Sequence, residues 1–351
     1  MATSATRQPC PTTAKVPTQQ HCLRLRVGEL VQVRNAAEIL STLDETGKLE
    51  ELPFMPEMLQ YCGHRFRVYK RADKSCDTII RDGIRRMYNT VHLELRCDGS
   101  AHGGCQAACL LFWKEAWLTR VADLVRIEES PQSCESPSYA EAPELLSRNA
   151  ISADPANITE MRYYCQATEL RKATSPLPWW EFSQYARDIW SGNVGVGAVL
   201  RAAAVGLFNR IQRWRGGTQY PLHFRVKFPR LLPGTRPQPP KPTKTPLEYL
   251  NLEPGELVQV KSWEEIRPTL NDNDRNRGLS FDREMLKYCG GTYRVLRRVD
   301  RLIDEKTGKM LDMKLPCIVL DGVVCCGDYN RFCPRAIYPY WREIWLRRVN
   351  A

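Results

Sequence analysis

The chain of 351 residues carries one sequence pattern twice. The string Gly28–Val33 (GELVQV) returns as Gly255–Val260, an offset of 227 residues that becomes 228 after the extra Gly322 of the second copy. A repeated unit of this length is most simply a folding unit, so we expect two like modules and a connection between them. The other matches follow in the same order: Glu38-Ile39 with Glu265-Ile266, Thr42-Leu43 with Thr269-Leu270, Tyr61-Cys62-Gly63 with Tyr288-Cys289-Gly290, Trp113-Lys114-Glu115 with Trp341-Arg342-Glu343, and Trp117-Leu118 with Trp345-Leu346.

Each copy predicts short strands and one short helix. Residues Gly28–Arg34 largely alternate apolar and polar side chains, as do Arg65–Tyr69 and Thr90–Glu94, and this is the period of a half-buried strand. A short helix is expected between Pro56 and Gly63, because proline is favoured near a helix start and glycine just past its end. We therefore expect a mainly β fold with α, in which two tandem SH3-like small barrels are joined by a partly helical central region.

Amino-acid composition distinguishes the segments that lie outside the two copies. Residues 127–160 hold seven acids against Arg148 alone, and residues 232–246 hold six prolines. Such stretches favour exposed linkers and extended tethers. The expected organisation is a disordered tail (1–26), a first module (27–126), an acidic linker (127–160), a helical central region (161–231), a Pro-rich basic tether (232–254) and a second module (255–351). Residues 1–20 lack the apolar run of a signal peptide, so a cytoplasmic protein is expected.

Fourteen cysteines are many for such a chain, and clustered thiols in a reducing compartment more often bind metal or do redox chemistry than form stable disulfides. Three pairs match between the copies, and each copy has one further cysteine that does not align. Four thiolates can hold a tetrahedral zinc ion. We therefore predict zinc ligands at Cys62, Cys76, Cys97 and Cys105 in the first module and at Cys289, Cys317, Cys325 and Cys333 in the second, with an iron–sulfur cluster as the less favoured alternative.

Other interpretations of these residues stay open. Free cysteine also serves as a small buried apolar residue. His64 and His102 could ligate metal in the first copy, but Gly291 and Asn330 occupy the matched positions, so we expect both to be solvated loop histidines. Cys109, Cys134 and Cys165 have no counterpart in the other copy, and a catalytic thiol among them would need a neighbouring base or cation. The sequence His92-Leu93-Glu94 is half of a zinc-deaminase motif whose other half is missing.

The central part of the chain is strongly basic. Residues 201–246 hold ten lysines and arginines and no acid, and Val196–Trp214 predicts an amphipathic helix. Most such helices pack within their own fold. This helix could also lie on an anionic membrane or form part of a nucleic-acid patch. The residues expected to meet an anionic partner are Arg201, Arg210, Arg213, Arg215, Arg225, Lys227 and Arg230.

Three strings resemble an uncharacterised bacterial family with two cysteine-containing repeats: Leu52–Leu59, Cys97–Gln106 and Tyr338–Leu346. No activity is known for that family, so the resemblance implies no function. Two hypotheses follow from the residues. The first is a non-enzymatic binding or scaffold protein with two metal-stabilised modules, whose partner is a protein or an anionic surface. The alternative is a metal- or thiol-dependent enzyme or redox sensor.

Overall fold

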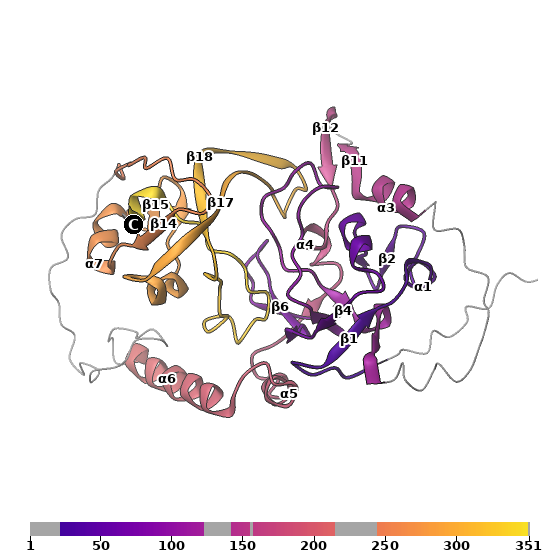
Figure 1. The fold of residues 1–351 in the computed structure, drawn as a ribbon. Helices are drawn as coiled ribbons and strands as arrows, with labels where there is room; N and C mark the ends of the chain where they lie inside the picture. The colour runs from indigo at the N-terminus through magenta and orange to yellow at the C-terminus, as the bar shows by residue number, and fades with distance from the viewer. Residues whose placement is uncertain (1–21, 123–141, 155–156, 215–243, 350–351) are drawn as a thin grey trace, which may run out of the picture.

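The computed structural model describes residues 22–122, 142–154, 157–214 and 244–349 (Figure 1). Their strands pair antiparallel in several small sheets, with short helices between them. The prediction of a mainly β fold with α is thus confirmed, and that of tandem SH3-like barrels stays a prediction. In the described ranges no helix is long and apolar enough to cross a membrane.

The first segment is built from short strands around a central strand, β1. Its elements are β1 (Leu30–Val33), α1 (Ala36–Leu40), β2 (Lys48–Leu49), β3 (Leu52–Pro53), η1 (Pro56–Tyr61), β4 (Arg65–Arg67), β5 (Lys70–Arg71), β6 (Lys74–Cys76), β7 (Ile84–Arg86), β8 (Thr90–His92), β9 (Trp113–Lys114), η2 (Glu115–Trp117) and β10 (Leu118–Arg120). β1 lies between β10 and β4, and β8 lies between β5 and β9. Asn35 caps α1, since its side chain accepts a hydrogen bond from the Glu38 N–H at 2.9 Å.

The second segment contains a similar series of elements, two of which are long strands. The elements are β14 (Leu257–Val260), α7 (Trp263–Ile266), η3 (Arg267–Thr269), β15 (Arg275–Asn276), β16 (Leu279–Ser280), η4 (Arg283–Tyr288), β17 (Thr292–Ile303), β18 (Met310–Leu320), η5 (Glu343–Trp345) and β19 (Leu346–Arg348). They form one four-stranded sheet in the order β18-β17-β14-β19 and the short pair β15-β16. β17 and β18 pair antiparallel and thus form one long hairpin.

A buried glutamate at matched positions organises both segments. Glu115 is fully buried, accepts two backbone hydrogen bonds from the segment leading into β1, and accepts a third from Arg71 at 2.7 Å. Glu343 accepts two backbone hydrogen bonds from the segment leading into β14 and one from Arg298 at 3.0 Å. A carboxylate that accepts several hydrogen bonds is stabilised in its charged form despite burial.

Matched tryptophans fill the two cores. The indole N–H of Trp117 donates to the Thr42 hydroxyl at 3.1 Å, and that of Trp345 donates to Thr269 at 3.0 Å. A phenylalanine ring packs edge-on against each, with centroids 5.2 and 5.3 Å apart. Both tryptophans are fully buried, and a hydrogen bond to the indole N–H lets such a large ring be buried at little polar cost.

The described residues between the two halves, 142–154 and 157–214, form helices and short strands. Their elements are α3 (Ala142–Ala150), β11 (Ile151–Asp154), β12 (Asn157–Tyr163), α4 (Gln166–Glu169), β13 (Ser175–Pro176), α5 (Ser183–Ser191) and α6 (Val196–Trp214). Leu146 of α3 is buried in the core of the first segment. Helix α3, which lies in the range that composition assigns to an acidic linker, therefore packs on the first segment.

Helix α6 covers the predicted range, Val196–Trp214. Leu200 and Leu207 are 64% and 62% exposed, so the expectation that this helix packs its apolar stripe within the fold is wrong for them. Arg201 is exposed as well. Of the other cations expected to meet an anionic partner, Arg210 and Arg213 lie in α6, whereas Arg215, Arg225, Lys227 and Arg230 lie outside the described residues.

Candidate metal centre

Three side chains from two parts of the first segment come together in its interior. Glu57 lies in η1, and Cys97 and His102 lie in the loop between β8 and β9. One oxygen, sulfur or ring nitrogen from each lies within 4.8 Å of the other two. These are donor types that zinc binds in proteins.

The contact between His102 and Glu57 requires a proton or a metal ion between the two side chains. His102 Nε2 lies 3.2 Å from the backbone carbonyl oxygen of Tyr164, which can only accept, so Nε2 is assigned the donor role. His102 Nδ1 lies 2.6 Å from Glu57 Oε1, and both side chains are 1% exposed. An imidazole nitrogen without a proton and a carboxylate oxygen are both acceptors. A proton, on the ring or on the carboxyl group, or a metal ion must therefore lie between them.

The third group is a thiol in surroundings that disfavour its charged form. Cys97 Sγ lies 3.8 Å from Glu57 Oε1. Burial, followed by the negative charge of Glu57, raises the pKa of Cys97 far above its ordinary value. Glu57 Oε2 is buried, and no described residue forms a hydrogen bond with it. A bound cation would relieve both conditions, because it pairs with the free oxygen and stabilises the thiolate.

A tight turn presents His102 to Glu57. Gly99 has φ +76°, and a Cβ atom there would lie 2.1 Å from the carbonyl oxygen of Cys105, so the loop admits no side chain at this position. The His102 N–H donates to the Gly99 carbonyl at 3.0 Å. This fold turns the histidine inward, and the solvated histidine expected at position 102 is wrong because the side chain is buried. His64 is exposed, as expected.

Four cysteines line a cavity of about 30 Å³ beside this group: Cys97, Cys105, Cys109 and Cys165. Two of them, Cys97 and Cys105, were predicted as ligands. Burial raises the pKa of Cys109 to about 12 and that of Cys165 to about 11. Comparison of the two copies could not single out these two thiols, since neither has a counterpart in the second copy.

The structure does not bring the predicted quartets together. Among the residues it describes, Glu57, Cys97 and His102 are the one group of three potential ligands found within ligand distance. Cys62 and Cys289 pack beside the first and second cores, Cys317 accepts a hydrogen bond from Arg342 at 3.5 Å, and Cys325 lines a separate cavity. Cys76 and Cys333 contact each other across the two segments. The predicted cysteine ligands therefore lie apart, because different strands and loops position them.

The matched place in the second segment has a different chemistry. Its loop makes the same turn, with the Asn330 N–H donating to the Gly327 carbonyl at 2.9 Å. Glu284, which matches Glu57, accepts backbone hydrogen bonds from Cys326 at 2.8 Å and from Gly327 at 3.1 Å. Asparagine thus stands where the first segment has its histidine. The second site lacks one of the three donors.

Sequence reasoning missed Glu57 as a ligand, although a signal was present. An acid recurs at matched positions 57 and 284, each followed directly by Met-Leu in a short helix. Both glutamates are 5% exposed. Cysteine spacing alone does not reveal this recurrence.

We compared the chain with protein-family models, with curated proteins and with solved structures, and none of them matches.

Proposed function

We propose that the chain is a non-enzymatic binding or scaffold protein, built from two like modules of small SH3-like barrels, in which a zinc ion stabilises the first module. The buried group of Glu57, Cys97 and His102 carries the metal part of the proposal. The Nε2–H of His102 donates to a backbone carbonyl, which is the outer contact that metal-bound histidines ordinarily make. A small module also gains from such an ion, because its core alone supplies little stability.

The proposed partner is an anionic membrane surface. Four aromatic side chains in and before α5 are between 44% and 70% exposed: Trp179, Trp180, Phe182 and Trp190. α5 is followed directly by α6, with its exposed leucines, and the two helices lie next to each other at one edge of the molecule (Figure 1). Residues 189–247 contain ten basic residues and no acid. Exposed tryptophan, phenylalanine and leucine beside cations suit the interface of an anionic bilayer, whereas a nucleic acid would use the cations and the aromatic rings but not the leucines.

Vesicle binding tests this proposal. Combining Trp179→Ala with Trp180→Ala should weaken binding to phosphatidylserine-containing vesicles by about a hundredfold, because burial of each ring contributes about 1.5 kcal/mol. Co-sedimentation with vesicles with and without phosphatidylserine, at low and high salt, measures the change. The unmodified chain should prefer the anionic vesicles, and salt should weaken the binding.

Tyr249→Ala is the matched control, because Tyr249 is an exposed aromatic residue outside α5 and α6. It should leave vesicle binding unchanged. Equal loss in this variant, or no preference of the unmodified chain for anionic vesicles, would contradict the membrane proposal. Binding to RNA or DNA without binding to vesicles would instead support the nucleic-acid alternative.

The thiols favour a binding role over a thiol-dependent enzyme. Burial raises the pKa values of Cys62 and Cys289 to about 11, and the same cause raises those of Cys109 and Cys165. Such thiols are protonated near neutral pH and are poor nucleophiles.

A further inference from the structure

Two cysteines from opposite halves of the chain form one buried pair. Cys76 ends β6, and Cys333 lies in the loop after β18. The backbone N–H of Cys76 donates to the Cys333 sulfur at 3.1 Å, and both side chains belong to one buried cluster. The two residues are 8% and 2% exposed. The pair is therefore a direct, non-covalent contact between the two segments.

The same contact occurs a second time with one thiol missing. Ile303 matches Cys76, and Cys105 matches Cys333. The backbone N–H of Ile303 donates to the Cys105 sulfur at 3.4 Å. The two segments thus exchange equivalent contacts, as the subunits of a two-fold dimer do. The first contact differs in having two sulfur atoms, and the second is a natural control for it.

The surroundings of Cys333 differ from those of the other buried thiols. Burial alone would raise its pKa, but hydrogen bonds from Cys76, followed by those from backbone N–H groups and by the charge of Arg335, lower it. The Arg335 guanidinium is buried, donates to the Cys76 carbonyl at 3.4 Å, and pairs with Glu305 at 3.2 Å. A cation held beside the pair stabilises a thiolate there.

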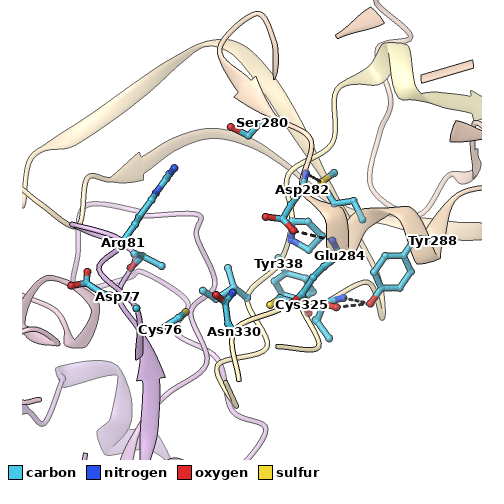
Figure 2. A pocket seen from close by; sticks show the side chains of 16 residues that line it. Cys76, Asp77, Arg81, Ser280, Asp282, Glu284, Tyr288, Cys325, Asn330 and Tyr338 are labelled. Carbon is cyan, nitrogen blue, oxygen red and sulfur yellow. Dashed lines mark hydrogen bonds between the residues drawn. The ribbon is translucent and has the colours of Figure 1, made fainter. Parts of the chain in front are cut away.

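A cavity reaches one member of the pair. It has a volume of about 380 Å³, and residues of both segments line it (Figure 2). Cys76 lies on the wall contributed by the first segment, whereas Glu284, Cys325 and Asn330 belong to the second. An oxidant as small as hydrogen peroxide can therefore approach the pair from the side of Cys76, whose backbone N–H contacts the Cys333 sulfur.

We propose that Cys76 and Cys333 are a redox pair, which a hydroperoxide converts to a disulfide that links the two modules covalently. The Cys333 thiolate attacks one peroxide oxygen, the O–O bond breaks, and hydroxide leaves, so that Cys333 becomes a sulfenic acid. The Cys76 sulfur then attacks the Cys333 sulfur, the S–O bond breaks, and the thiol proton leaves with the hydroxyl group as water. Two thiols are oxidised by two electrons in total, and hydrogen peroxide is reduced to two molecules of water.

Peptide mapping of the full chain tests the pair directly. Trypsin should release Ser75–Arg81 and Phe332–Arg335, and each of these peptides contains one cysteine. After brief treatment with dilute hydrogen peroxide and blocking of free thiols, we expect these two peptides to be joined and to separate on reduction. Cys76→Ser should abolish this product and leave Cys333 as the more readily oxidised thiol. Cys105→Ser should leave the product unchanged.

A variant that gains a cross-link tests the geometry without depending on the loss of a product. Ile303→Cys places a second thiol beside Cys105, in the contact that matches Cys76 and Cys333. Peroxide should then yield a second cross-link, between positions 105 and 303. Over-oxidation of Cys333 without a disulfide, or cross-linking between other cysteines that persists in Cys76→Ser, would overturn the proposal.

Discussion

His102→Asn is expected to lower the free energy of unfolding by about 3 to 5 kcal/mol, because it leaves the Glu57 carboxyl group buried without its partner and removes one metal ligand. The substitution introduces the residue that the second segment carries at the matched position, Asn330, in a loop with the same turn. The side chain should therefore fit. Chemical denaturation of the full chain measures the change.

A chelator separates the metal contribution from that of a His102–Glu57 ion pair. Excess EDTA should lower the stability of the unmodified chain and leave that of His102→Asn unchanged. The control variant His64→Asn alters an exposed histidine and should behave as the unmodified chain does in both conditions. If EDTA left the unmodified chain unchanged while His102→Asn remained destabilised, the histidine would act as a charged partner of Glu57 and not as a ligand.

Acid should destabilise the chain through a different histidine. The ring of His92 is fully buried, its Nδ1–H donates to the Leu111 carbonyl at 2.8 Å, and Nε2 has no partner among the described residues. Burial lowers the pKa of His92 from 6.5 to about 3. Between these two pH values the unfolded chain binds a proton that the folded chain does not. Stability is therefore present above pH 6.5 and falls as the pH drops, by about 1.4 kcal/mol per pH unit and by about 5 kcal/mol in all.

His92→Val tests this pH dependence. Valine is the residue at the matched position, Val319, which is 1% exposed, so the substitution is compatible with a core site of this kind. Unfolding measured at pH 7 and at pH 4.5 should show that the variant loses about 3 kcal/mol less than the unmodified chain over this interval. An equal loss in both chains would mean that other groups cause the acid sensitivity.

Local patterns predicted the secondary structure well. The alternation around β1 and β14, the helical turn after Pro56 and the range of α6 all depend on neighbouring residues, and the structure has elements at each of these places. The expectation of an acidic linker rested on composition alone. Leu146 lies in that stretch and is buried on the first core, and this burial depends on a surface far along the chain. Local secondary-structure propensity does not predict contact with such a distant surface.

The candidate metal centre could be predicted only in part. Cysteine matching identified Cys97, but Glu57 and His102 contact each other through a turn that depends on Gly99, and the matched copy lacks the histidine. The Cys76–Cys333 pair was also out of reach, because each cysteine was assigned to a site within its own module. This pair forms where the two segments meet, and cysteine spacing along the chain does not predict how two modules pack.

Elemental analysis of the full chain, purified without added metal beside His102→Asn, tests the central claim most directly. We predict one zinc ion per chain, no visible absorbance, and loss of the zinc in the variant. A chain without metal, or a variant that keeps the full zinc content, would contradict a metal centre at Glu57, Cys97 and His102.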